Sequence, residues 1–254
     1  MKIILFTQND PFYLAESTKD FIQKVKESDE HEIIKAIVTP PSPFGKKEKS
    51  YEKAIKTLKI FGIRFFIFYS FKFIIRRFFL NKSVIKEIKK SGTPLWILDA
   101  SINNKKNVQI LKNLNPDVII IIAGNQIIKK QVLDIPKYGV INAHSSLLPN
   151  YKGLMPTFWV LKNRDLETGV TLYKLTEGID DGPIISQRKI KIDKNTSQSE
   201  LIIKCKEVAN DLILDSLDMI KNEDEFTSNE GGSYYMFPTR MDVKEFYRNG
   251  NKFF

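Results

Sequence analysis

The stretch DVIIIIAG at residues 117–124 decides the fold, because its apolar residues follow one another without polar alternation. Such a run suits a strand that is covered on both faces. Four other runs share this character: KIILFT (2–7), EIIKAIVT (32–39), PLWILDA (94–100) and GVINAH (139–144). Segments with helical periodicity separate them. The sequence therefore predicts a parallel sheet with crossover helices on both of its faces.

The first strand leads into a turn without glycine. Asp10 and Pro11 in this turn are typical of a helix start. The expected helix places apolar residues at core-facing spacing, namely Leu14, Phe21, Ile22 and Val25. Because residues 7–12 contain no glycine, the phosphate-binding fingerprint of dinucleotide-binding folds is absent.

The pattern changes after Gly169. In the run PIISQRKIKI (183–192) polar and apolar residues alternate, which predicts a half-exposed strand added antiparallel to the sheet edge. Ser197 and Glu200 then form a capping box, and Cys205 lies on the apolar stripe of the helix that follows. We expect a doubly wound, mostly parallel α/β sheet over residues 1–195. Residues 196–254 add a helix, a linker at 222–232 and a short β-containing tail as a small C-terminal appendage.

Composition restricts the function classes. The chain has 254 residues, of which 42% are hydrophobic and 28% charged, as in ordinary soluble globular proteins. One cysteine and two histidines exclude a disulfide framework and a zinc cage rich in nitrogen and sulfur ligands, so we expect no metal. The apolar run at the N-terminus is too short for an export signal. These features together predict a cytoplasmic protein.

The basic charge has several interpretations. The net charge is +10, but the lysines are scattered along the whole chain, which favours a solvated surface over a nucleic-acid footprint. The aromatic residues of 51–80 are interrupted by Arg64, Lys72, Arg76 and Arg77, so no spanning helix is expected there. This segment can form helices packed on the sheet, a basic amphipathic surface for a membrane, or an interface between copies in a homodimer.

A candidate site lies at the end of the run at 139–144. Asn142 and His144 are two residues apart on a strand and project from the same face, toward the crevice beyond the carboxyl ends of the strands. The amide can donate to an oxygen that becomes negative, and the imidazole can move a proton near neutral pH. A carboxylate from the turn GIDDGP (178–183) can orient the imidazole. The alternative is that these groups only satisfy backbone atoms at a strand end and in a hairpin.

The segment NAHSSLLPNYKG (142–153), followed by GIDDGPII (178–185), resembles the signature of the folate-dependent formyltransferases. The resemblance covers residues 90–195 most firmly. It implies that Asn142, His144 and Asp180 are catalytic and that N10-formyltetrahydrofolate is the cosubstrate. Asp180 corresponds to the family's aspartate because it follows the apolar residue and stands two positions before the glycine. The resemblance also implies contacts with the pterin, for which the candidates are Gln126, Ile127, Ile128 and Ile179.

The sequence differs from three branches of this family, and these differences restrict which amine can be the substrate. The first turn lacks the glycine of glycinamide ribonucleotide transformylases, and we expect too few residues after Ile220 for the tRNA-binding barrel of initiator-tRNA formyltransferases. No regulatory domain is expected before the first strand, unlike in formyltetrahydrofolate hydrolases. The tail GGSYYMFPT (231–239) is similar to the end of several nucleotide-sugar N-formyltransferases.

We therefore expect a formyl transfer to the amine of a nucleotide-linked amino dideoxy sugar used in surface polysaccharides. Adjacent tyrosines offer an aromatic face for a base, unless they only fix the tail to the core. The candidate substrate contacts are Asn9, Asp10, Arg76, Arg77, Tyr234 and Tyr235. The alternatives are an enzyme that formylates methionyl-tRNA, a noncatalytic folate- or nucleotide-binding protein, and a basic RNA-binding protein.

Overall fold

A seven-stranded sheet forms the centre of the molecule. The computed structural model describes residues 1–41, 49–80, 82–222 and 225–254. In spatial order the strands are β3 (Leu95–Ile97), β2 (Glu32–Thr39), β1 (Lys2–Gln8), β4 (Val118–Ile122), β5 (Val140–His144), β7 (Glu167–Lys174) and β8 (Ile184–Lys191). The first five are mutually parallel, whereas β7 runs antiparallel to β5 and to β8. The mostly parallel sheet and its antiparallel edge are thus confirmed.

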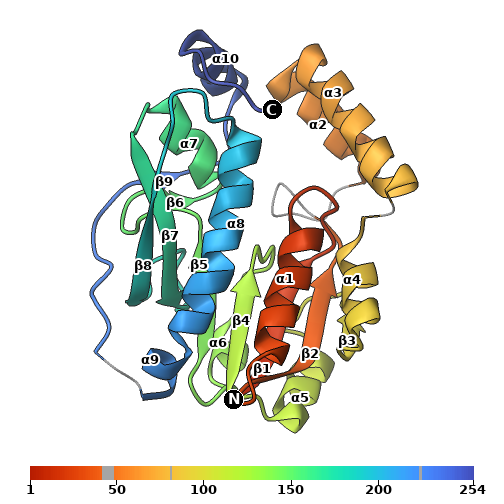
Figure 1. The fold of residues 1–254 in the computed structure, drawn as a ribbon, viewed down its shortest axis with the longest axis vertical. Coiled ribbons are helices and arrows are strands. Elements are labelled where there is room, and N and C mark those ends of the chain that lie inside the picture. The colour runs from red at the N-terminus through yellow and green to blue at the C-terminus, as the bar shows by residue number, and fades with distance from the viewer. Residues whose placement is uncertain (42–48, 81, 223–224) are drawn as a thin grey trace.

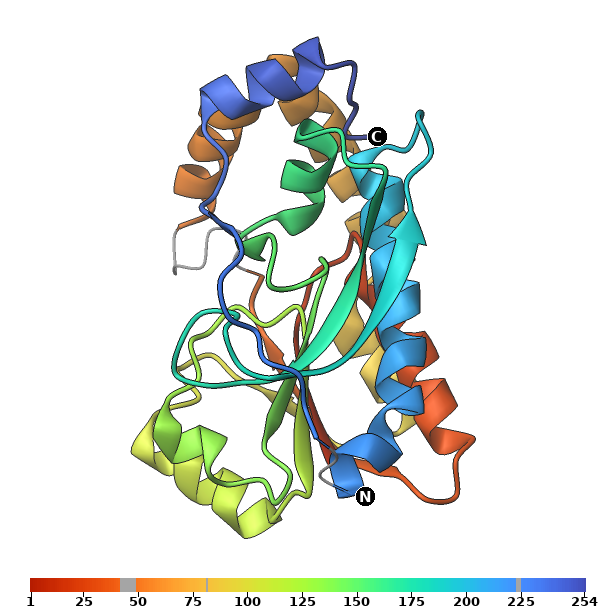
Figure 2. The same cartoon turned by 90° about the vertical axis from the view of Figure 1, so that its left-hand side faces the viewer.

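Helices cover both faces of this sheet (Figures 1 and 2). One face packs on α1 (Leu14–Lys26), α4 (Val84–Ser91) and α8 (Gln198–Asp215), and the other on α5 (Lys105–Leu114) and α6 (Lys130–Leu133). The central strand β4 shows why its residues are all apolar. Ile120 belongs to the core on the α1 side, while Ile119 and Ile121 belong to the core on the α5 side. Because successive side chains of a strand point to opposite faces, both faces require apolar residues.

The helix starts follow local capping chemistry. Ser197 Oγ accepts from the Glu200 N–H at 3.2 Å and the Glu200 carboxylate accepts from the Ser197 N–H at 2.7 Å, so the predicted capping box is present at α8. Cys205 is fully buried on this helix, as predicted. The start of α1 differs, because the helix begins at Leu14 and not at Asp10 and Pro11.

Two helices lie outside the sheet layers, α2 (Ser50–Phe61) and α3 (Ile63–Ile74), and α3 continues into the π-helical turn η1 (Ile75–Phe79). Figure 1 shows them beside the C-terminus of the chain. The ring of Phe253 contacts the rings of Phe61 and Phe65 at centroid distances of 5.5 and 4.9 Å. These helices therefore pack on the end of the chain, which lies close to α10 (Arg240–Arg248). None of the helices in the described ranges is long and apolar enough to cross a membrane.

The stretch predicted as a linker is partly fixed in place. The backbone of Thr227 pairs with Ile184 through two hydrogen bonds of 2.8 and 2.9 Å, and Asn229 is buried. Beyond it, β9 (Tyr234–Tyr235) pairs in parallel with β6 (Lys152–Gly153), in the loop that precedes α7 (Pro156–Lys162). The short helix α9 (Leu217–Asn222) connects α8 to this stretch. The C-terminal segment is thus attached to the loop after β5.

Candidate active site

The carboxyl end of β5 brings an amide, a phenol and a carboxylate together. Asn142 lies opposite Tyr173 in the antiparallel ladder between β5 and β7, so the two side chains share one face of the sheet. Asn142 Nδ2 donates to the Tyr173 hydroxyl at 2.9 Å, and that hydroxyl donates to Asp180 Oδ1. The tyrosine therefore links the predicted asparagine to the predicted aspartate.

His144 lies on the same face, two residues after Asn142. Its Nε2 lies 2.8 Å from the carbonyl oxygen of Tyr151. Because a carbonyl oxygen only accepts, Nε2 holds a hydrogen and donates it. Nδ1 then faces Asp180, and its distance to Oδ2 is 3.6 Å, which suits an ion pair but is too long for a hydrogen bond. The imidazole is buried, so solvent screens this pair weakly.

Hydrogen bonds to its side chain and to its backbone fix the position of Asp180. It has a left-handed backbone with φ of 51°, and its Oδ2 accepts from the Gly153 N–H at 2.8 Å. The Asn229 side-chain amide donates to the carbonyl oxygens of Asp180 and Gly182 at 2.9 and 3.0 Å. The neighbouring carboxylate of Asp181 accepts from Thr176 instead. Asp180 is therefore the carboxylate of this turn that lies against His144.

Burial and the adjacent Asp180 carboxylate hold the pKa of Tyr173 well above its usual value. The phenol therefore stays protonated at ordinary pH and can donate continuously to the carboxylate. Sequence analysis missed Tyr173 and Asn229. Tyr173 belongs to an apolar strand, and its position opposite Asn142 depends on the register between β5 and β7, which sequence patterns do not reveal. Asn229 lies in a polar stretch that has no periodicity.

The candidate pterin contacts divide into exposed and internal groups. Ile127 and Ile179 are 72% and 55% exposed, on the loops that follow β4 and β7. Ile128 is buried in the core on the α5 side. The Gln126 side chain accepts from the Ile102 N–H at 2.8 Å and donates to a second backbone group of the same loop at 3.1 Å. Of these four candidates, only Ile127 and Ile179 therefore present exposed apolar side chains.

The candidates for diphosphate and sugar contacts meet at the first turn. Asn9 Oδ1 accepts from Ser83 at 3.0 Å. The Asp10 carboxylate accepts from the N–H groups of Phe12 and Tyr13 at 2.8 and 3.2 Å, which gives it a role in the turn, and burial raises its pKa. Arg76 donates to the carbonyl of Pro11 at 2.9 Å and pairs with the Glu16 carboxylate at 3.1 Å.

The guanidinium of Arg76 thus lies at the first turn, where it is already paired with Pro11 and Glu16. The side chain of Arg77 lies outside the part of the chain that the structure describes.

The two tail tyrosines differ. Tyr235 stacks on Tyr151 and Trp159 at centroid distances of 5.2 and 4.7 Å, and its hydroxyl accepts from Asn163. It therefore fixes the tail to the loop before α7. Tyr234 is 54% exposed and presents its ring to solvent. In the described ranges no group of three or more His, Cys, Asp or Glu residues could hold a metal ion.

The comparisons with known proteins identify the family. The family model described as formyl transferase matches residues 2–217. The chain belongs to this family. The formyltransferase region extends from β1 through α8, and it contains Asn142, Tyr173, Asp180 and His144.

Relatives of this formyltransferase carry different names. A methionyl-tRNA formyltransferase from Caldicellulosiruptor saccharolyticus is 31% identical over 209 residues, which are 81% of this chain and 58% of that protein. This chain spans about half the length of the curated relatives it matches.

Solved structures share the fold. A sugar N-formyltransferase from Shewanella sp. has a TM-score of 0.61 at 16% identity and covers 98% of this chain and 88% of its own. An N-formyltransferase from Helicobacter canadensis, in complex with folinic acid and dTDP-3-aminofucose, has a TM-score of 0.58 at 18% identity over 98% of this chain and 80% of its own.

Proposed function

We propose that this chain transfers the formyl group of N10-formyltetrahydrofolate to the amine of a nucleotide-linked amino dideoxy sugar. The observation that supports it most is the linked set of Asn142, Tyr173, Asp180 and His144 at the carboxyl end of β5. Open parallel sheets bind ligands at this edge. The exposed Ile127 and Ile179, on the loops that follow β4 and β7, would supply apolar surface for the flat face of a pteridine.

The side chains suit acyl transfer to an amine. The cosubstrate supplies an electrophilic formyl carbon. Asn142 has a second amide hydrogen besides the one donated to Tyr173, and it can donate that hydrogen to the formyl oxygen as negative charge develops there. His144 Nδ1 can accept a proton from the attacking amine, since Nε2 is already committed to a carbonyl. Asp180 stabilises the resulting imidazolium across 3.6 Å.

We give His144 the role of a proton relay. Both N–H groups of the imidazolium have partners, because Nε2 faces Tyr151 and Nδ1 faces Asp180. The histidine is therefore better placed to relay the amine proton toward the departing folate nitrogen than to stabilise the oxyanion. Asn142 remains as the oxyanion donor.

Two observations support the amino sugar as acceptor. The tail strand β9, which contains Tyr234, pairs with β6. The Gly153 N–H in β6 donates to Asp180, so Tyr234 lies next to the strand that contacts the proposed catalytic carboxylate. The superposition on the Shewanella sugar N-formyltransferase includes this tail, since it covers 98% of the chain. The second candidate is formylation of methionyl-tRNA, which the names of the curated relatives favour.

The test is a direct comparison of acceptors. The protein is incubated with N10-formyltetrahydrofolate and either a panel of dTDP- and UDP-linked amino dideoxy sugars or charged initiator tRNA, while tetrahydrofolate release and the mass of the acceptor are followed. We expect turnover with an amino sugar. Turnover with the tRNA alone would replace the proposal by the second candidate, and binding of folate without turnover on either acceptor would indicate a noncatalytic protein.

The variant Asn142→Ala tests the site. Removal of one oxyanion donor typically lowers kcat by about 10²–10³-fold. Asn113→Ala on α5 is the control and should leave kcat unchanged, as should a chelator of divalent metals. Turnover of Asn142→Ala near that of the parent protein would exclude the proposed role of the amide.

A further inference from the structure

The outer face of the α2–α3 hairpin exposes apolar side chains without a cover. Along α3 and η1, Ile63, Ile67, Phe71, Ile74 and Phe78 recur at intervals of three and four residues, so they form one stripe of a helix surface. All five are exposed, and Phe71 and Phe78 reach 62% and 72%. Exposed apolar residues also occur on α2 and at the end of η1, namely Tyr51, Ile55, Leu58, Phe79 and Leu80. Soluble proteins seldom expose so continuous an apolar surface without a partner.

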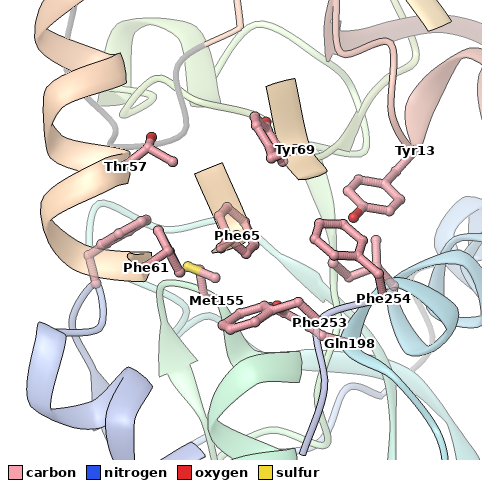
Figure 3. A pocket seen from close by; sticks show the side chains of 11 residues that line it. Tyr13, Thr57, Phe61, Phe65, Tyr69, Met155, Gln198, Phe253 and Phe254 are labelled. Carbon is pink, nitrogen blue, oxygen red and sulfur yellow. The ribbon is translucent and has the colours of Figure 1, made fainter. Parts of the chain in front are cut away.

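The inner face of the same hairpin is already occupied. Phe61 and Phe65 stack at a centroid distance of 4.6 Å, and Phe65 stacks on Tyr69 at 5.4 Å. Figure 3 shows these rings around a cavity of about 260 Å³ that is closed on another side by Phe253 and Phe254. No residue of α3 is fully buried. The helix is thus apolar on both sides, and only its inner side has protein to pack on.

Basic residues outnumber acidic ones in α2, α3 and η1, where Glu52 at the start of α2 is the acidic residue. From Lys53 to Lys86 the sequence contains nine lysines and arginines and no aspartate or glutamate. Lys59 and Arg64 are exposed near the junction of α2 and α3. Apolar residues flanked by many lysines and arginines and few acidic residues characterise helices that lie in the interface of a membrane with anionic lipids.

We propose that the outer face of the α2–α3 hairpin docks on a lipid bilayer that contains anionic headgroups. The phenylalanines and isoleucines of the stripe enter the boundary between headgroups and acyl chains, while Lys59 and Arg64 contact the headgroup phosphates. Docking of this kind lies on the surface of the bilayer, in agreement with the absence of a helix suited to crossing it among the described residues.

Docking would also orient the active site. Met155 lines the aromatic cavity, and it follows by two residues Gly153, whose N–H donates to Asp180. The residues that line the cavity and the loop that holds Asp180 thus share one short segment of chain, 153–155. The proposal goes beyond the proposed function and does not depend on it.

The test uses the full chain and vesicles of phosphatidylcholine, with or without phosphatidylglycerol, in a flotation assay. We expect binding to the anionic vesicles, little binding to the neutral ones, and loss of binding as salt is raised, because salt screens the headgroup attraction. Phe71→Ser with Phe78→Ser should reduce the partition coefficient at least roughly tenfold, since each ring loses the burial of a large apolar surface. Leu166→Ser, at an exposed leucine in the turn before β7, is the matched control and should bind like the parent chain.

Several outcomes would overturn the proposal. Equal binding to neutral and anionic vesicles, or no binding to either, would contradict it. A dimer in light scattering that the double serine variant dissociates, without vesicle binding by the parent chain, would identify a second copy as the occupant. The charge reversals Lys59→Glu and Arg64→Glu provide a second variant that alters no apolar contact, and unchanged binding by it would remove the electrostatic part of the argument.

Discussion

The substitution Tyr173→Phe removes one oxygen atom from the centre of the site and leaves the ring in place. The ring is 2% exposed and packs with Leu148 and Ile184. The lost hydroxyl accepts from Asn142 and donates to Asp180. Asp180 then keeps the Gly153 N–H on its other oxygen, while the Asn142 amide loses the partner that orients it. The change therefore tests positioning without removing any proposed catalytic group.

The expected magnitude follows from the two bonds. A hydrogen bond to a charged group contributes about 1.5–3 kcal/mol, and one between neutral groups about 1 kcal/mol. If the hydrogen bond to the carboxylate stabilises the transition state by its full free energy, its loss should decrease kcat about 10- to 150-fold, because about 1.4 kcal/mol corresponds to a factor of ten. KM should change less, since the hydroxyl faces Asn142 and Asp180. The substitution Tyr173→Phe should also lower the free energy of unfolding by about 1–3 kcal/mol.

The assay is steady-state turnover with whichever acceptor the comparison of amino sugars and tRNA yields, together with thermal unfolding. Tyr247→Phe on α10 removes a phenol from a helix outside the site and is the control. A Tyr173→Phe variant with the parent kcat would refute the argument that this hydroxyl organises the site. A loss of activity in proportion to unfolded protein alone would assign Tyr173 a purely structural role.

Three further outcomes are expected. Asn229→Ala releases the carbonyl oxygens of the Asp180 turn and should reduce kcat at least tenfold while KM changes little, a pattern that unchanged kinetics would contradict. Burial raises the pKa of the Cys205 thiol to about 12, so little thiolate is present at pH 8. Alkylation, followed by mass spectrometry, should therefore modify this cysteine only after unfolding in urea. Rapid alkylation of the folded chain would show that Cys205 is accessible to the reagent. Ser197→Ala breaks the capping box of α8 and should lower the free energy of unfolding by about 1 kcal/mol in a urea titration, in contrast to Ser28→Ala in the turn after α1.

The sheet was predictable because its strands are apolar on successive residues. Residues 118–122 must supply side chains to two cores at once, and only a strand between two helix layers needs that pattern. The start of α1 was less predictable. Asp10 and Pro11 look like a helix start, but the carboxylate closes a turn on Phe12 and Tyr13 and the helix follows it.

The candidate site was predictable where a local motif defines it. Asn142 and His144 share a face by the alternation of a strand, and Asp180 is marked by its place before a glycine. Tyr173 and Asn229 were not predictable, since their contacts depend on strand register and on a distant segment that folds back. The side chains of Gln126 and Arg76 show the same limit of sequence-based prediction. The sequence offers Gln126 as a pterin contact and Arg76 as a substrate contact, but it does not reveal that both side chains are hydrogen-bonded to backbone atoms.

The return of residues 227–235 to the loop after β5 has a consequence for biosynthesis. Ser233 binds the backbone of Tyr151 and Lys152, and Asn229 binds that of Asp180, so the loop and turn that flank His144 acquire these contacts late. On the ribosome, a nascent chain that has emerged only as far as α8 holds its histidine and aspartate without this brace. Catalytic competence should therefore arise only after residues 227–235 have emerged from the ribosome, when most of the sheet has already formed.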